Sequence, residues 1–244
     1  MDVNSNKYTF GFAAVMVIVV ASILAFASES LKPYQKMNIR HEKMQNILAS
    51  VGINVDRHKS EEAFNKYVTK QIVIDAQGNE LSEDKLNGLT AFDIDVVKEY
   101  RNIKDITERH YPLFEITKDN GNKYYVVPMA GTGLWDLIWG YVAFESDLNT
   151  IAGTKFDHKG ETPGLGAEIT KPFFQNAFIG KKILDENGEF KGINVIKGGT
   201  SPDNPHGINA ISGATLTCVG VDEMLNRTLK VYVPYFKKIA QQES

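Results

Sequence analysis

The stretch 209–217, Asn-Ala-Ile-Ser-Gly-Ala-Thr-Leu-Thr, combines small residues with hydroxyl groups and runs directly into an amphipathic pattern. Ser212 and Thr215 are candidate helix caps, and Gly213 allows the backbone to turn sharply just before the helix. Free amide groups and the positive end of the helix dipole would then face the Thr215 hydroxyl, which is an arrangement suited to a phosphate. Apolar residues recur every three or four positions after Thr215 and predict one buried helix face: Val221, Leu225, Leu229, Tyr232 and Phe236.

A second stretch that could bind a ligand is 158–166, His-Lys-Gly-Glu-Thr-Pro-Gly-Leu-Gly. Pro163 fixes one backbone angle, and Gly164 and Gly166 remove side chains, so this loop could lie flat against a planar ligand. A tight turn without a ligand explains the same residues when the loop is considered alone. Its side chains offer two hydrogen-bonding groups and one apolar surface: Glu161, Thr162 and Leu165.

Two further features resemble phosphate or nucleotide sites. The Gly-x-Gly of residues 131–133 lacks a third glycine and a following helix, so it does not indicate a dinucleotide-binding loop, and no P-loop pattern occurs. Lys197 leaves a predicted strand just ahead of the Thr215 turn, where its ammonium could meet a phosphate or the electron-rich edge of a ring. A surface lysine without a ligand is the alternative.

The composition limits what else the chain could do. Its 244 residues are 43% hydrophobic and carry a formal charge of −3, which allows one substantial core with a small appendage and does not favour nucleic-acid binding. The single cysteine, Cys218, forms neither a disulfide within the chain nor a zinc or iron–sulfur site alone. The five histidines lack ligand spacing, so we predict no metal site.

An uncharged stretch near the N-terminus predicts one membrane helix. Residues 8–28 contain no charged side chain, and at about 1.5 Å per residue they would extend roughly 31 Å, the thickness of a bilayer core. A cleaved signal peptide is the alternative, because Ala25-Phe-Ala27 resembles a cleavage site. Basic residues follow the span more often than they precede it, and charge alone would therefore keep the following domain in the cytoplasm. These residues are Lys32, Lys36, Arg40 and Lys43 against Lys7.

The remaining patterns indicate an α+β domain with an antiparallel sheet. Residues 34–51 predict an amphipathic helix that ends at Gly52, with Met37, Met44, Ile47, Leu48 and Val51 on one side. Charge runs in the polar stretch 78–110 are interpreted as solvated faces without chemistry. We predict further helices over 61–70 and 167–176, hairpins over 111–129 and around 185–188, and strands over 71–75, 139–144, 150–157 and 192–196. The predicted division is a membrane helix (1–30), a helical linker and accessory region (31–110) and a cofactor domain (111–244).

Three motifs occur together and in order: Gly131-Thr-Gly-Leu-Trp135, Glu161-Thr-Pro-Gly-Leu-Gly166 and Ser212-Gly-Ala-Thr215. With the membrane span, this set resembles the C subunit of the sodium-translocating NADH:quinone oxidoreductase over nearly the whole chain, most strongly from residue 130 onward. The G subunit of the Rnf-type electron-transport complex shares the flavin-binding domain and remains an alternative. The longer insertion over 53–110 favours the sodium-translocating family. A membrane-tethered scaffold domain without a cofactor is the alternative from another class.

The resemblance implies a covalent cofactor. In this family FMN is joined through its phosphate to the threonine of the Ser-Gly-Ala-Thr motif, here Thr215, by a separate flavin transferase that uses FAD. Thr217 is the second candidate hydroxyl, although it lies deeper in the helix. The implied site contains no catalytic residue and no metal. Its cofactor-binding residues are Thr215, Ser212, Gly213, Ala214, Glu161, Thr162, Gly164, Leu165, Gly166, Lys197 and Trp135.

The resemblance also implies the setting of the protein. It would be a single-pass electron-transfer subunit of a bacterial inner-membrane translocase that oxidises NADH, reduces quinone and exports sodium ions, and it would not be catalytic alone. Its partners would be the other subunits, the flavin transferase and the lipid bilayer, with no nucleic acid. The family places the flavin domain in the periplasm, against the charge count. This chain departs from the family at Asn209, where aspartate is common, and at Cys218, where a small hydroxyl residue is expected.

Overall fold

The computed structural model describes residues 5–242, and it divides into two compact units between Lys43 and Met44. The predicted start of the membrane helix at residue 1 and the predicted end of the cofactor domain at residue 244 lie outside the described residues. Apart from Ser5, the described part of the first unit consists entirely of helix α1 (Asn6–Ser50), which continues into the second unit. Among residues 5–242 it is the one helix long and apolar enough to cross a membrane. The predicted span and the predicted amphipathic helix after it are therefore one continuous helix.

The C-terminal end of α1 belongs to the core of the second unit. Met44, Ile47 and Leu48 are almost completely buried there, whereas Met37 is 51% exposed. The buried part of the predicted face thus begins at Met44. The helix ends at Ser50, and Gly52 adopts a positive φ of 78°, which glycine tolerates at a helix C-terminus.

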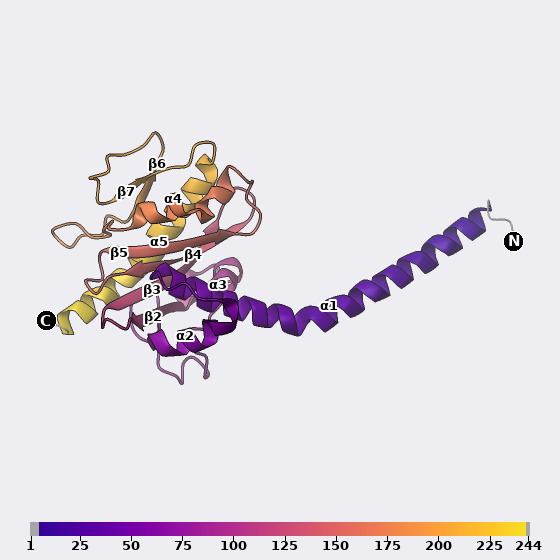
Figure 1. The fold of residues 1–244 in the computed structure, drawn as a ribbon, viewed down its shortest axis with the longest axis horizontal. Helices are drawn as coiled ribbons and strands as arrows, with labels where there is room; N and C mark the ends of the chain where they lie inside the picture. Colours follow the sequence, from indigo (N-terminus) through magenta and orange to yellow (C-terminus); the bar gives the residue numbers. More distant parts are fainter. Residues whose placement is uncertain (1–4, 243–244) are drawn as a thin grey trace. The chain divides into compact units, whose positions relative to one another are not determined.

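A five-stranded antiparallel sheet forms the centre of the second unit (Figure 1). The strands pair in sequence order, and short turns suffice to join most of them, so the predicted antiparallel α+β fold is confirmed. At the predicted hairpin, Gly121 supplies the positive φ of the turn. The strands are β1 (Val68–Ile74), β2 (Tyr111–Thr117), β3 (Lys123–Thr132), β4 (Leu137–Phe144) and β5 (Ile151–His158).

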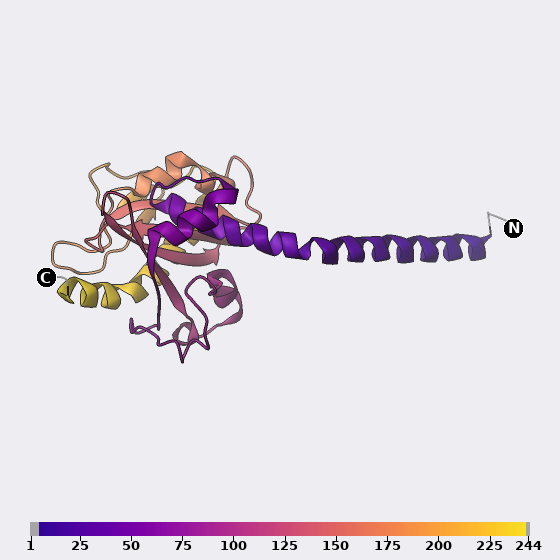
Figure 2. The ribbon, with the colours of Figure 1, turned by 60° about the horizontal axis from the view of Figure 1, so that its bottom comes forward.

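Helices cover both faces of this sheet because its side chains alternate between two cores (Figure 2). In β3, Tyr125 and Val127 face the core that contains helix α5 (Thr215–Gln242). Tyr124 and Val126 face the second core, which contains the end of α1 and helix α2 (Ser60–Tyr67). All five predicted apolar positions of α5 are at most 2% exposed. The predicted buried face of this helix is confirmed.

Residues 78–110 are more ordered than their sequence indicates. They contain helix α3 (Val96–Asn102) and the 3-10 turn η2 (Ile106–Glu108), and Asp95 caps α3 by accepting a hydrogen bond from the Lys98 amide at 3.1 Å. Apolar residues between charged ones pack into the second core: Leu86, Ala91, Phe92 and Ile94. These apolar residues are irregularly spaced because the backbone here is irregular, so neither a helical nor a strand period in the sequence predicts their burial. Another 3-10 turn, η1 (Arg57–Lys59), precedes α2, which ends three residues before the predicted limit of 70.

The helix predicted over 167–176 is wrong as a single element. The segment instead forms three short pieces, η3 (Gly166–Thr170), α4 (Pro172–Gln175) and η4 (Asn176–Phe178). Pro172 drives its preceding residue out of the helical region, and Lys171 is extended at φ −85° and ψ 148°. The hairpin around 185–188 forms, closed by a bridge between Leu184 and Phe190.

A small parallel pair lies ahead of α5. Strand β6 (Asn194–Ile196) corresponds to the strand predicted over 192–196, and it pairs with β7 (Gly207–Asn209), which the sequence did not reveal. Because β7 leads directly into the turn before α5, this pair fixes where that turn begins.

Candidate functional site

The N-terminus of α5 presents an exposed hydroxyl beside free backbone donors. Thr215 is exposed, while Ala214 before it is buried at 4% exposure. Within α5 the Cys218 amide is the first to bond back along the chain, donating to the Ala214 carbonyl at 2.9 Å. Within residues 5–242 the amides of 215–217 have no hydrogen-bond partner, and neither do the hydroxyls of Ser212 and Thr215. This end of the helix can therefore receive a negatively charged group.

The second candidate hydroxyl points the other way. Thr217 is 1% exposed, and its Oγ1 donates a hydrogen bond to Oε2 of Glu161 at 2.5 Å. Successive residues of an α-helix are rotated by about 100°, so residues two apart lie on nearly opposite sides. With Thr217 turned inward, Thr215 is directed outward. The structure thus separates the two hydroxyls by accessibility, as their positions in the helix predict.

Glu161 links two of the sequence motifs to the first turn of α5. Its carboxylate is buried at 4% exposure, and its Oε1 accepts a hydrogen bond from the backbone amide of Trp135 at 2.9 Å. The other oxygen accepts from Thr217, so both point away from solvent. Two motif glycines leave the space that this carboxylate fills. A Cβ at Gly133 would lie 2.5 Å from Oε1, and one at Gly166 would collide with Oε2 and with the Thr217 hydroxyl.

The loop of residues 161–166 lies against the turn before α5. A Cβ at Gly213, whose φ is +77°, would come within 2.7 Å of Cδ2 of Leu165. The indole nitrogen of Trp135 donates to the Thr162 hydroxyl at 3.2 Å. The side chains of Trp135 and Leu165 are large and apolar, yet they are 69% and 41% exposed. An open apolar surface therefore borders the outward-facing Thr215, and it suits a planar ring better than water.

Lys197 and Asn209 lie at the ends of the parallel strand pair. Lys197 follows β6 and is exposed. The residue before it, Ile196, accepts a hydrogen bond through its carbonyl from the Ala210 amide at 3.0 Å. The backbone of Lys197 is therefore near the start of the turn, while the side chain makes no ion pair within the described residues. Asn209 accepts a hydrogen bond from the Thr200 amide through Oδ1 at 2.7 Å. The aspartate that the resemblance leads us to expect at this position could make the same bond.

Cys218 lies in the first turn of α5 and contacts the segment that precedes the helix. It is 2% exposed, and its Sγ accepts a hydrogen bond from the Ile211 amide at 3.3 Å. A serine hydroxyl could accept that bond as well. Burial raises the pKa of the Cys218 thiol, which keeps it neutral and unreactive.

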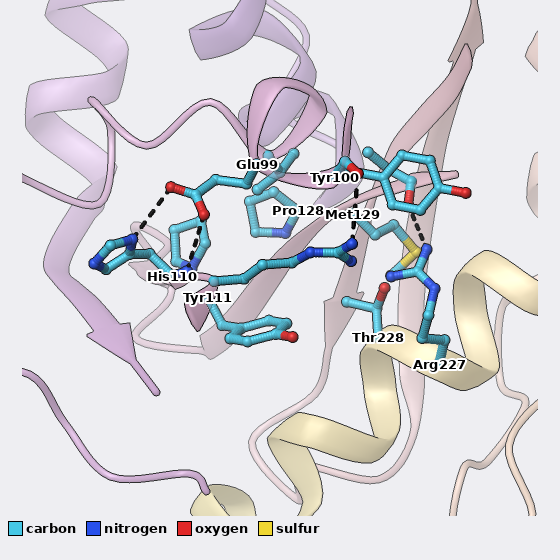
Figure 3. A pocket seen from close by; sticks show the side chains of 12 residues that line it. Glu99, Tyr100, His110, Tyr111, Pro128, Met129, Arg227 and Thr228 are labelled. Atoms are coloured by element: carbon cyan, nitrogen blue, oxygen red, sulfur yellow. Dashed lines mark hydrogen bonds and ion pairs between the residues drawn. The ribbon is translucent and has the colours of Figure 1, made fainter. Parts of the chain in front are cut away.

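The sequence does not predict a separate pocket that lies between α3, β3 and α5 (Figure 3). Its polar wall centres on Tyr100, whose ring contacts the guanidinium groups of Arg109 at 5.3 Å and Arg227 at 4.7 Å. The Tyr100 hydroxyl shares a hydrogen bond with Oγ1 of Thr132 at 3.0 Å. The cavity measures about 20 Å³, which holds about one water molecule and no flavin. These contacts attach the 78–110 region to α5 and to β3, the strand that leads into the Gly-Leu-Trp motif.

An outward threonine at a helix N-terminus lies beside an open apolar loop, and the segment that contains both belongs to a known class of domain. Residues 133–230 match the FMN-binding domain family.

Relatives of this chain extend the match beyond that domain. The chain is 33% identical to the C subunit of the Na(+)-translocating NADH-quinone reductase of Haemophilus ducreyi, over 90% of this chain and 88% of that protein. It is 31% identical to the same subunit of Vibrio campbellii, over 89% and 88%. The crystal structure of this subunit from Parabacteroides distasonis is similar with a TM-score of 0.73 and 40% identity, covering 84% of this chain and 96% of that one. The chain belongs to the family of C subunits of the Na(+)-translocating NADH-quinone reductases.

Proposed function

We propose that this chain is an electron-transfer subunit whose FMN is joined to Thr215 through a phosphodiester. The observation that carries the proposal is the exposed Thr215 hydroxyl next to the unpaired amides of residues 215–217. The site fits the group in two respects, since the helix end can hold a phosphate and the open surface can hold a ring. When bound, FMN supplies one- and two-electron transfer.

The attachment uses the chemistry of a hydroxyl nucleophile. The Thr215 oxygen forms a bond to the phosphorus of the FMN half of FAD, the phosphoanhydride bridge breaks, and AMP leaves. The hydroxyl proton passes to a base of the separate flavin transferase. The diester keeps one negative charge, which the free amides and the helix dipole stabilise. Thr217 does not compete, because its hydroxyl is buried and bound to Glu161.

The chain would hold the ring between the motifs that meet at the helix. Trp135 and Leu165 offer exposed apolar area, and Thr162 is held beside the indole by their hydrogen bond. Lys197, exposed at the end of β6, would favour negative charge on the cofactor. A covalent bond would keep the cofactor in place in a compartment from which a free flavin could diffuse away. The glycines Gly164, Gly166 and Gly213 would allow close approach of backbone.

The apolar part of α1 would anchor the protein in the bacterial inner membrane, with residues 111–244 as the flavin domain in the periplasm and residues 31–110 as linker and accessory region. The complex would pass electrons from NADH to quinone and export sodium ions, and this chain would relay electrons between the other subunits without catalysing a reaction alone. The positive-inside count opposes this orientation. We give precedence to the family, because its motifs are more specific than a few charges.

The test is covalent fluorescence. The full chain is produced with the flavin transferase, denatured, separated on a gel and viewed under ultraviolet light. Fluorescence in the wild type and in Thr217→Ser, lost in Thr215→Ala, supports the proposal. A dark wild-type band, from cells whose transferase labels another protein, overturns it and favours a scaffold without cofactor. Copurification with the other subunits and NADH-dependent sodium uptake into vesicles then distinguishes this complex from the Rnf type.

A further inference from the structure

We infer that Glu161 is a positioning residue that turns the Thr215 hydroxyl toward the flavin transferase, an inference that rests on the proposed function. The sequence predicts that Glu161 faces the ligand as a hydrogen-bonding group. Both of its oxygens instead face the protein, where they bridge two elements that are distant in the chain.

The bridge is specific in its geometry. Oε1 receives the amide of Trp135, 26 residues away in the turn after β3, and Oε2 receives the hydroxyl of Thr217, 56 residues away in α5. The backbone amide of Glu161 donates to Nδ1 of His158 at 3.1 Å, which holds the residue from its own side. One carboxylate therefore joins the loop, the strand turn and the helix start.

A buried carboxylate fills space at a higher free-energy cost than an apolar side chain of similar size. Burial of such a group is unfavourable unless hydrogen bonds compensate it, and an apolar side chain would pack at lower cost. The chain nevertheless gives up a side chain at Gly133 and at Gly166, the two positions where a Cβ would collide with the carboxylate oxygens. The surrounding residues therefore leave room for a hydrogen-bonded carboxylate, although an apolar side chain of the same volume would fill the space.

The effect of the bridge on Thr215 follows from helix geometry. The buried face of α5 sets the rotation of the helix about its axis, and the bond between Thr217 and Glu161 holds the first turn in line with that face. Thr215 lies about 200° around the helix from Thr217, and it is therefore held on the outer side. The loss of this bridge would leave the first turn freer to unwind, and Thr215 would then lose its fixed direction.

The first experiment compares rates of flavin attachment in the full chain in detergent, with purified transferase and FAD. Glutamine at 161 retains both bonds, because its oxygen accepts from the Trp135 amide and its amide group donates to the Thr217 hydroxyl. We expect Glu161→Gln and Thr217→Ser within about twofold of wild type. Glu161→Ala, which loses both bonds, and the isosteric Thr217→Val, which loses one, should be slower by about fivefold or more. Rescue by the conservative variants separates positioning from loss of volume.

The second experiment measures hydrogen–deuterium exchange of the peptide containing Trp135 in the unmodified chain, where no flavin is involved. Protection should fall in Glu161→Ala and persist in Glu161→Gln. If Glu161→Ala does not fold, as judged by circular dichroism, Thr217→Val carries the rate comparison. Wild-type rates of attachment in the bond-losing variants overturn the inference, whether or not protection falls. A wild type that is never labelled overturns the proposed function instead, and this inference with it.

Discussion

Replacing Gly166 by alanine should destabilise the domain far more than the same change elsewhere in its loop. The added Cβ would collide with Oε2 of Glu161 and with the Thr217 hydroxyl, so at least one of these groups must move. Losing a hydrogen bond to a charged group costs about 1.5–3 kcal/mol, and overpacking costs about 1–3 kcal/mol. Alanine also lowers the conformational entropy of the unfolded chain, which stabilises the folded state by about 0.4–1 kcal/mol and partly offsets these losses. We expect a net loss of about 2–5 kcal/mol in the free energy of unfolding.

Thermal and urea unfolding of the full chain in detergent measure this loss. For a domain of this size each kcal/mol lowers the melting temperature by about 2–4 °C, so Gly166→Ala should melt roughly 5–15 °C lower. Two controls lie in the same loop. A Cβ at Gly160 meets open space, and the Gly160→Ala change should be within about 0.5 kcal/mol of wild type. Gly164 has open space but a φ of +76°, so Gly164→Ala should cost about 1–2 kcal/mol from backbone strain alone. Equal stability of Gly166→Ala and Gly160→Ala would refute the close packing of the Glu161 carboxylate.

Two further predictions concern titrating groups. Because Cys218 is buried and burial raises the pKa of its thiol, iodoacetamide at pH 8 should label the folded chain at least about tenfold more slowly than the chain in urea; equal rates would contradict the buried position. The hydrogen bond from Lys159 at 2.8 Å lowers the pKa of Asp136 below its ordinary value of 3.8. Its contribution to stability is therefore present above pH 3.8 and is lost as the pH falls through the lower, folded pKa. The urea midpoint should drop between pH 6 and pH 3, and by less in Asp136→Asn; an unchanged drop in that variant would assign the acid sensitivity to other groups.

The sequence predicts the elements whose burial follows a regular period. The strand hairpin, the antiparallel order and the buried face of α5 could be predicted because each depends on residues close together in the chain. The break at Pro172 is also a local signal, which the apolar pattern of the segment outweighed in the prediction. Strand β7 is only three residues long, and its pairing with β6 is made by backbone atoms, so side-chain patterns do not reveal it.

The site shows the same limit more sharply. The structure brings the three motifs together, yet the Glu161 carboxylate turns inward because its hydrogen-bond donors come from residues 26 and 56 positions away. The sequence equally does not reveal the contacts of the Tyr100 ring with Arg109 and Arg227, since they join a weakly patterned stretch to a helix more than a hundred residues later. Such contacts depend on how finished elements pack, and no local pattern encodes them.

The order of the strands has a consequence for when the site forms. Neighbouring strands from β2 to β5 close short loops, whereas α5 reaches back across long ones, as in the hydrogen bond from the Tyr232 hydroxyl to the Pro112 carbonyl across 120 residues. Closing long loops costs more chain entropy, so we expect the sheet to assemble first and α5 to dock last. Until that helix docks, Thr217 has no partner in Glu161 and Thr215 has no fixed direction. Flavin attachment would then mark completed molecules, and a labelled chain would be one whose C-terminal helix has already folded onto the sheet.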